Sequence, residues 1–285
     1  MLLRDFLPSP AVREFVQCYR IVHLEFAQSD KIPLKAYPPK PEQCLHFFLR
    51  DFFAIQKPDE GKSSQPAIML AGQRTSLVEQ TTGNNFINVQ VVFQPTATYR
   101  LTGIPAYELT NQHLDATSIF HKNINTTFEQ LQQAKNYTEL LTIIESFCQG
   151  LILNAKKDNL PLDAISRQMI QKDGNISVDW LAKESCLCTK QFKRKFLERT
   201  GVNPKTYSRI IRFNQAFNFK NRFPQKDWLS IAIACGYYDY QHLVKDYKEF
   251  TGLAPNEFHL LESKSPESIL GLADSLYRDR IKPII

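Results

Sequence analysis

The stretch from Leu181 to Pro204 reads LAKESCLCTKQFKRKFLERTGVNP, and a related stretch from Ile231 to Pro255 reads IAIACGYYDYQHLVKDYKEFTGLAP. Both begin with an aliphatic residue and alanine, carry two large apolar residues four positions apart, and end in Thr-Gly-x-x-Pro. The matching positions are 50 residues apart at the start and 51 later, so the second copy has one extra residue around Gly236. An internal repeat of this kind predicts two copies of one structural unit.

Each copy fits a helix-turn-helix unit: a short helix, a tight turn, and a second helix that ends at a glycine with proline just beyond it. In the first copy Phe192 and Phe196 are four residues apart, so both are expected on the side of the second helix that faces the core. Leu243 and Tyr247 take the same places in the second copy. The opposite sides are predicted to contact DNA. The predicted contact residues, including one lysine of the following helix, are Thr189, Lys190, Lys193, Arg194, Lys195, Lys205, Tyr240, Gln241, His242 and Lys245.

Basic residues concentrate around the first of these units. The formal net charge of the 285-residue chain is +6, but between positions 186 and 226 eleven Lys or Arg residues stand against one acidic residue, Glu198. A local excess of this kind is typical of a surface that binds a polyanion. A solvated helix surface explains many such runs; here the basic residues interleave with apolar aromatic residues, which favours the DNA-binding interpretation.

The segment between the two copies, residues 204–220, is predicted to form one helix with a buried side. Its apolar residues lie at positions 207, 210, 211, 213 and 217. Ile210 and Phe213 are expected to pack the two units together and hold them at a fixed separation. If both second helices enter successive major grooves on one side of DNA, that separation is about one helical turn, roughly 34 Å.

Three motifs then indicate a family resemblance: Gly236-Tyr-Tyr-Asp239, the run from Lys245 to Pro255, and Pro204-Lys-x-Tyr-x-Arg209-x-x-Arg212-Phe213. On these motifs, residues 161–258, about a third of the chain, resemble the DNA-binding domain of the AraC/XylS family of transcription regulators. The resemblance implies that the exposed positions of 189–199 and 240–248 belong to recognition helices.

The chain departs from the family pattern in two places. The family usually has serine where this chain has Cys188, a poor helix cap, and Thr189 is expected to substitute for it. The second unit is less basic than the first, with Asp239, Asp246 and Glu249 nearby. The first unit is therefore expected to supply most of the binding to bases and phosphates, and the second a weaker, more sequence-tolerant contact.

Residues 1 to about 120 have the pattern of a β-rich domain. Short apolar runs at 44–49, 67–70 and 86–93 favour strands, and turn-forming residues separate them at 38–39, 58–61 and 82–85. Many short strands with turns predict a small barrel or sandwich. From Asn125 the pattern is helical: Thr126 and Glu129 have capping-box spacing, and 138–153 is periodically apolar.

The predicted fold class is α+β: an N-terminal small β-barrel or sandwich with a helical pair, then an all-α DNA-binding domain with two helix-turn-helix units joined by a linker helix. The stretch 92–105 resembles, more weakly, the cupin-like sensory domains attached to such regulators, which implies effector binding, dimerisation or both. The expected boundaries are 1–153 for the sensory domain (β-rich 1–120, helical 125–153), 154–160 for a linker, 161–262 for the DNA-binding domain, opened by Pro161, and 263–285 for a tail.

Other chemistry is weakly represented. The histidines that a cupin-like metal site would need, His23, His46, His113 and His121, include no His-x-His pair, and no Gly-rich nucleotide loop or nucleophile elbow occurs. Cys186 and Cys188 suggest either a redox sensor or, as favoured, small residues buried in the helix-turn-helix core. The aromatic group at 47, 48, 52 and 53 fits a ligand pocket or an ordinary core equally well.

Two classes of function remain. The first is a sequence-specific DNA-binding transcription regulator, not an enzyme, with no catalytic residue, metal or cofactor; its expected partners are double-stranded DNA, a small-molecule effector and a second copy of the chain. The alternative is an enzyme or small-molecule carrier in the β-rich half, with the helical region as a targeting module. RNA binding is weaker still, since no stacking-sheet motif is present. Six scattered cysteines, no apolar run of roughly 18–20 residues and no secretory signal predict a cytoplasmic protein with free thiols and no membrane partner.

Overall fold

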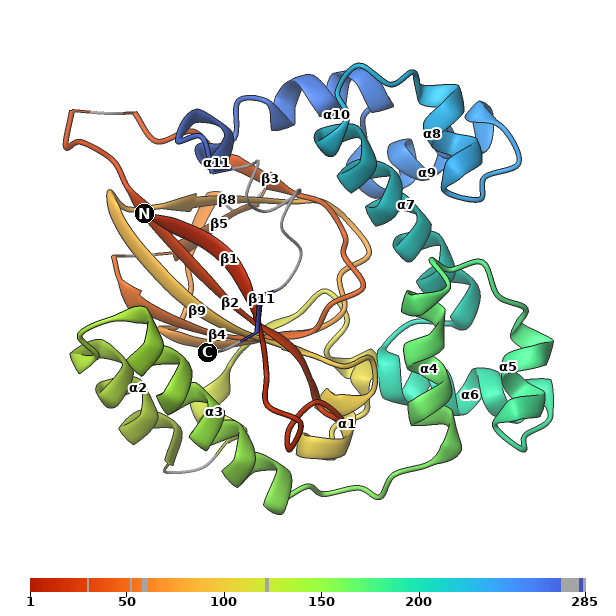
Figure 1. Ribbon diagram of the computed structural model, residues 1–285, viewed down its shortest axis with the longest axis horizontal. Coiled ribbons are helices and arrows are strands. Elements are labelled where there is room, and N and C mark those ends of the chain that lie inside the picture. Colours follow the sequence, from red (N-terminus) through yellow and green to blue (C-terminus); the bar gives the residue numbers. More distant parts are fainter. Residues whose placement is uncertain (30, 52, 58–60, 121–122, 273–281, 284–285) are drawn as a thin grey trace.

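The computed structural model describes residues 1–29, 31–51, 53–57, 61–120, 123–272 and 282–283. Phe52, His121 and the predicted turn residues 58–60 lie outside the described residues, as does most of the predicted tail (273–281 and 284–285). The chain folds into two β-sheets followed by a series of helices (Figure 1), which confirms the predicted α+β class. None of the described helices is long and apolar enough to cross a membrane.

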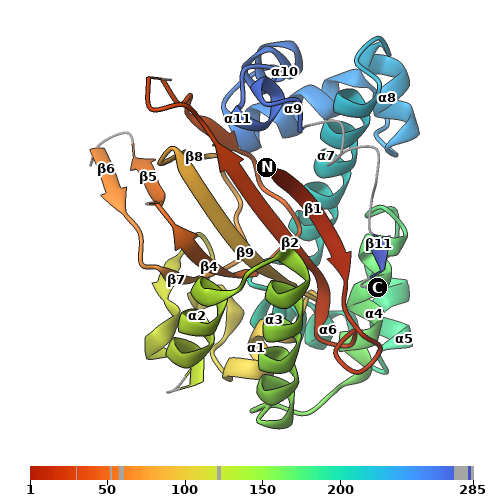
Figure 2. The same cartoon turned by 60° about the vertical axis from the view of Figure 1, so that its left-hand side comes forward.

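The N-terminal half contains a large and a small sheet, which Figure 2 shows from the side. The large sheet has the strand order β10-β7-β4-β9-β2-β1-β11, with antiparallel neighbours except for the parallel pair β1 and β11. Its strands are β1 (Leu2–Leu7), β2 (Val16–Glu25), β4 (Cys44–Arg50), β7 (Ile68–Ala71), β9 (Asn85–Phe93), β10 (His113–Asp115) and β11 (Lys282–Pro283). The small sheet, with the order β3-β8-β5-β6, contains β3 (Lys35–Tyr37), β5 (Phe53–Lys57), β6 (Gly61–Ser64) and β8 (Val78–Thr82).

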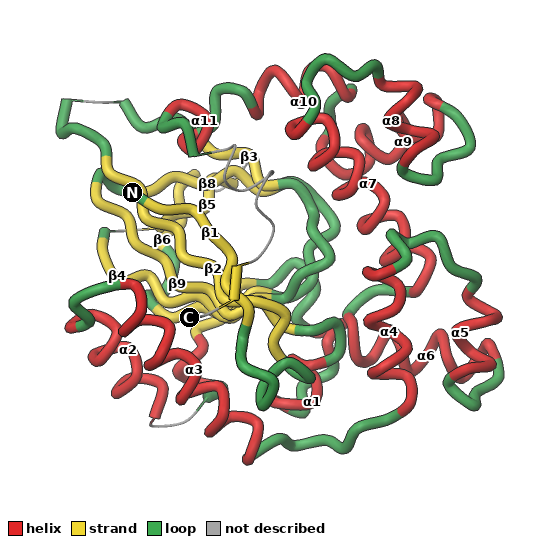
Figure 3. Tube along the Cα trace, viewed as in Figure 1, coloured by secondary structure: helices red, strands yellow, loops and turns green. Residues whose placement is uncertain are grey.

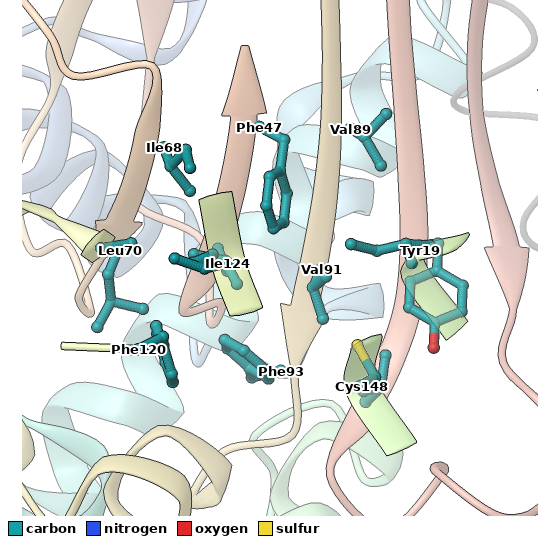
Figure 4. Close-up of a cluster of buried hydrophobic side chains, with 14 of the residues drawn as sticks. Tyr19, Phe47, Ile68, Leu70, Val89, Val91, Phe93, Phe120, Ile124 and Cys148 are labelled. Carbon is teal, nitrogen blue, oxygen red and sulfur yellow. The ribbon is translucent and has the colours of Figure 1, made fainter. Parts of the chain in front are cut away.

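Two helices, α2 (Asn123–Gln133) and α3 (Tyr137–Leu153), cover the outer face of the large sheet. Side chains alternate along a strand, so every second residue of β9 faces these helices. Val89, Val91 and Phe93 are buried in one cluster with Ile124 of α2 and Cys148 of α3 (Figure 4). Asn88 and Gln90 of β9 face the small sheet instead, and line a cavity between the two sheets.

The start of α2 corrects one sequence prediction. Thr126 lies inside the helix, which begins at Asn123, so the predicted capping box with Glu129 does not form. The cap of α3 is Asn136, whose side chain accepts a hydrogen bond from the backbone N–H of Glu139. Short helices α1 (Ala97–Thr102), η1 (Ala106–Glu108) and η2 (Ala116–Ser118) complete this half.

The C-terminal half is helical and lies to one side of the two sheets (Figures 1 and 3). Its helices are α4 (Pro161–Gln171), α5 (Val178–Glu184), α6 (Thr189–Thr200), α7 (Pro204–Arg222), α8 (Trp228–Ala234), α9 (Tyr240–Thr251), α10 (Pro255–Glu262) and α11 (Pro266–Ile269). The two sequence repeats become the helix pairs α5–α6 and α8–α9, each with the predicted glycine at the end of its second helix.

Helix α7 joins the two units, but different residues serve each of them. Ile210 and Phe213 are fully buried in the cluster of the second unit, whereas Tyr207 and Ile211 belong to the cluster of the first. The prediction that Ile210 and Phe213 pack both units together is therefore wrong in detail. These two residues pack only in the second unit, and other residues of the same helix face the first unit. The helix as a whole does share its buried side chains between the two cores.

Gly201 ends α6 and lies where the first unit meets the N-terminal half. Its φ angle is +89°, a left-handed conformation that a glycine adopts without strain. A Cβ atom at this position would lie 2.7 Å from the Thr110 hydroxyl oxygen and 2.8 Å from the Ala106 carbonyl oxygen. The same residue thus terminates the helix and permits a close approach between the two halves of the chain.

Candidate nucleic-acid interface

Helix α6 has one buried and one exposed side, as the sequence predicts. Phe192 and Phe196 are fully buried, with their ring centroids 5.6 Å apart. Lys190, Lys193 and Arg194 are exposed on the other side of the helix. Residues separated by three or four positions share a helix face, so these three cations form one basic surface.

The remaining predicted residues of the first unit are less uniform. Lys205 is exposed at the start of α7, and Lys195 is half-buried. Thr189 is the first residue of α6, and its hydroxyl donates to Asp179 of α5 at 2.9 Å. The expectation that Thr189 caps α6 is therefore wrong: Cys188 is the cap residue, and its side chain makes no capping hydrogen bond.

The two cysteines of the first unit are exposed. Cys186 lies in the turn between α5 and α6 with a φ angle of +55°, and Cys188 precedes α6. The prediction that they are small buried core residues is therefore wrong, because the turn places them outside the core that Phe192 and Phe196 fill. A thiol-sensing role stays a prediction.

In the second unit, the structure exposes Gln241, His242 and Lys245 and leaves Tyr240 half-buried. Asp239 caps α9 by accepting from the backbone N–H of His242, and its Oδ1 lies 2.8 Å from the His242 ring Nδ1. This contact holds the imidazole against the start of the helix. A carboxylate at this end of α9 also makes the second unit less attractive to phosphate than the first.

Two of the eleven basic residues between 186 and 226 serve the fold instead of an outer surface. Arg199 is buried and donates to both carboxylate oxygens of Asp163 at 2.7 Å. Arg209 forms ion pairs with Asp246 at 2.7 Å and Glu249 at 2.5 Å. Counting charges along the sequence therefore overstates the positive charge that this region offers to DNA.

The N-terminal half covers the last turn of α6. The Tyr99 hydroxyl donates to Glu198 at 3.2 Å, the Gln43 side chain donates to the Thr200 carbonyl at 2.9 Å, and Thr110 donates to the Gly201 carbonyl at 2.7 Å. These contacts leave the first turns of α6, which carry the exposed cations, uncovered. The part of α6 that is open to DNA is therefore its N-terminal part.

Two exposed apolar residues lie beside these surfaces and were not among the contact residues predicted from the sequence. Leu197, 37% exposed, continues the helical spacing of Lys190, Lys193 and Arg194, so that spacing would have predicted it. Tyr238, 85% exposed, precedes α9, and its ring centroid lies 5.9 Å from that of His242. No local pattern distinguishes Tyr238 from a buried turn residue.

A second candidate site is a partly open cavity between the two sheets. Both sheets line it, with His46 on β4 and His113 on β10 among its polar residues. Burial lowers the pKa of His46 to about 3, which keeps this imidazole neutral. His23 lies on the other face of its strand, where its ring Nδ1 is 2.6 Å from the Tyr137 hydroxyl. Within the described ranges, no group of three or more His, Cys, Asp or Glu residues is arranged to hold a metal ion.

Comparison with protein families gives two matches. Residues 181–259 match the model of a helix-turn-helix domain, over the region that contains both repeated units. The chain carries an AraC-type helix-turn-helix domain. Residues 4–115, which contain most of the two sheets, match a domain of unknown function (DUF6597).

Several solved structures match the chain at low identity. ToxT from Vibrio cholerae is 14% identical, with 85% of this chain and 98% of that chain covered and a TM-score of 0.47. ToxT from Vibrio cholerae O395 bound to (E)-4-(8-methylnaphthalen-1-yl)but-3-enoic acid is 13% identical, with 86% and 99% covered and a TM-score of 0.47. The regulator CdpR from Pseudomonas aeruginosa is 14% identical, with 62% and 46% covered and a TM-score of 0.31. No curated protein sequence matches the chain.

The charge on the AraC-type domain predicts a measurable salt dependence. If the exposed cations neutralise about six phosphates, the plot of log affinity against log salt concentration is expected to have a slope of about −5. Lys205→Gln is expected to reduce that slope by about one and to leave sequence preference almost intact. The matched control is Lys135→Gln, which removes an exposed lysine between α2 and α3. A slope near zero for the wild-type protein would show that the basic surface does not meet DNA phosphates.

Proposed function

We propose that the chain is a sequence-specific transcription regulator that reads DNA mainly with the first turns of α6 and senses a small molecule in the cavity between its sheets. The main support for this proposal comes from α6. Lys190, Lys193 and Arg194 are exposed on one side of this helix, and its other side is buried in an AraC-type domain. Arginine and lysine side chains on a recognition helix reach guanine edges and phosphates in the major groove. The second unit, with Gln241 and Lys245 exposed, adds a weaker contact.

The direct test is selection of bound sequences from a random double-stranded DNA library with the full-length protein, followed by affinity measurements on the preferred site. Arg194→Ala is expected to weaken binding to that site by about 1–3 kcal/mol and to relax preference at one base position. Binding to random DNA should change much less. Equal losses on both DNAs would show that Arg194 contacts a phosphate and that base reading lies elsewhere.

The cavity and a homodimer are the remaining parts of this proposal. A concave site with apolar walls and a few convergent polar groups is typical of a small-molecule site. Phe53 and Phe86, which pack against Phe48, offer apolar surface on its walls, whereas Phe47 is buried on the opposite face of the large sheet beneath α3. A second copy of the chain, bound through the N-terminal half, would double the number of helix-turn-helix units on an operator; sedimentation with and without operator DNA tests this.

A further inference from the structure

The cavity between the sheets has an apolar end and a charged end. The apolar side chains that line it are Val22, Leu24, Phe53, Met69 and Phe86. The charged side chains that line it are Arg20, Lys35, Lys40, Glu42, Arg74 and Glu267. Four cations and two carboxylates therefore face the same space, and two further carboxylates, Asp5 and Glu262, pair with Arg20 and Lys35.

Two of the four cations are paired. Arg20 binds Asp5 at 2.7 Å and Glu42 at 2.9 Å. Burial opposes the ionisation of Glu42, but Arg20 lowers the pKa of this carboxyl to about 2, so the pair stays charged. Lys35 of β3 is the second paired cation, and its partners come from the helical half.

The other two cations, Lys40 and Arg74, form no ion pair with a described residue. Nη1 of Arg74 is buried and has no hydrogen-bond partner. Burial lowers the pKa of both side chains, in contrast to that of Lys35, whose pKa is raised by its two carboxylates in spite of burial. Both side chains are half-buried, and the Arg74 guanidinium lies over the Tyr37 ring, 5.5 Å from its centroid. Partial burial disfavours a cation that has no counter-ion, and an anion in the cavity would supply that counter-ion.

The partners of Lys35 connect the cavity to the second helix-turn-helix unit. Lys35 forms ion pairs with Glu262 at the end of α10 and, at 2.6 Å, with Glu267 of α11. Both helices follow α9 directly, and α11 lies over β3 at the mouth of the sandwich (Figure 1). Glu267 also lines a small adjoining hollow that reaches Phe217 of α7. Glu267 thus lies at one edge of the cavity, and Glu262 reaches the same lysine from α10.

We propose that the cavity binds a small organic anion, a carboxylate or phosphate on an apolar body, and that this anion competes with Glu267 for Lys35 and so loosens α10 and α11 from the sensory half. The anionic group would lie between Lys40, Arg74 and Lys35, and the apolar body between Phe53 and Phe86. Because an anion beside Glu267 repels that carboxylate, ligand binding and the docking of α11 oppose each other. This inference rests on the proposed sensory function and specifies its ligand class and its regulation.

The test uses the full-length protein and three probes with one apolar body: 4-phenylbutyrate, its neutral amide, and 4-phenylbutyl phosphate. Calorimetry is expected to show at least tenfold tighter binding of an anionic probe than of the amide, and comparison of the two anions distinguishes carboxylate from phosphate recognition. Hydrogen exchange at the backbone amides of α10 and α11 is expected to speed up when the anion is bound. Equal affinity for the amide and both anions would overturn the proposal.

Variants test the roles of the individual groups. Arg74→Gln is expected to reduce the anion preference to less than threefold, and Arg74→Lys, which keeps the charge, to retain most of it. Glu267→Gln is expected to tighten anion binding several-fold because it removes the internal competitor, whereas Glu129→Gln, an exposed control on α2, should leave it unchanged. Unchanged affinity in Glu267→Gln would refute the competition with Glu267.

These measurements are made without DNA, so the outcomes separate. Selective anion binding by a protein that fails to select any DNA sequence would refute the proposed regulator and support the ligand assignment. Selective DNA binding without any anion preference would support the proposed regulator and refute the ligand assignment.

Discussion

Phe213→Ala is expected to lower the free energy of unfolding of the second helix-turn-helix unit by about 3–5 kcal/mol, because it removes a fully buried aromatic side chain and leaves a cavity. The Phe213 ring centroid lies 4.8 Å from that of Tyr247 and 5.3 Å from that of Phe250, both on α9. The ring therefore packs α7, the joining helix, against α9. Its loss should also weaken DNA binding through that unit.

Trp228 provides a local measurement, since it packs against Tyr247 in the same cluster with ring centroids 5.4 Å apart. The chain has two tryptophans, so a Trp180→Phe background leaves Trp228 as the single fluorescent reporter during urea unfolding. Phe223→Ala, which truncates a 43% exposed phenylalanine one residue beyond α7, is the matched control and should change stability by no more than about 0.5 kcal/mol. An unchanged midpoint for Phe213→Ala would show that α7 is not a structural spacer.

Asp163→Ala is expected to have an effect of similar size on the first unit, about 3–5 kcal/mol, because it leaves the buried Arg199 guanidinium without its counter-charge. The Asp163 side chain is fully buried and that of Arg199 is 6% exposed. Asp163 also accepts a hydrogen bond from the backbone N–H of Leu160 at 2.7 Å, which fixes the start of α4. The substitution therefore removes an ion pair and a helix cap together.

A Trp228→Phe background leaves Trp180 of α5 to report unfolding of the first unit. Asp158→Ala, at an exposed position between α3 and α4, is the control and should have little effect. Replacing both charges, Asp163→Leu with Arg199→Met, is expected to cost less than Asp163→Ala alone, since no unpaired charge remains buried. If the single and double variants were equally destabilised, packing rather than charge would explain the loss.

The helix-turn-helix units could be predicted from the sequence because their determinants are local. Pairs such as Phe192 with Phe196, and the glycines that follow each second helix, lie within one or two turns of each other in the sequence. The strands at 44–49 and 86–93 were also visible as apolar runs, and the structure confirms them as β4 and β9. Strand β2 was missed, because Arg20 interrupts its apolar pattern to face the cavity.

The contacts between the two halves could not be predicted in the same way. Tyr99 and Glu198 are 99 residues apart, and Lys35 and Glu262 are 227 apart, so no periodicity relates them. In a sequence, Lys40 and Arg74 resemble ordinary surface charges, since burial depends on how β3 and the following loops close over the large sheet. The same limit explains why Arg199 and Arg209 were counted in the basic excess between positions 186 and 226.

Gly201 bears on how related chains should vary. A chain in which the two halves do not touch still needs a glycine at the end of α6, because the left-handed backbone remains. The neighbours across the contact, Thr110 and Gln43, would then be free to change. Where they do change, they should change together in an alignment, while the glycine column stays constant. Covariation of positions 43 and 110, at a fixed glycine, would thus mark which relatives keep the first helix-turn-helix unit docked.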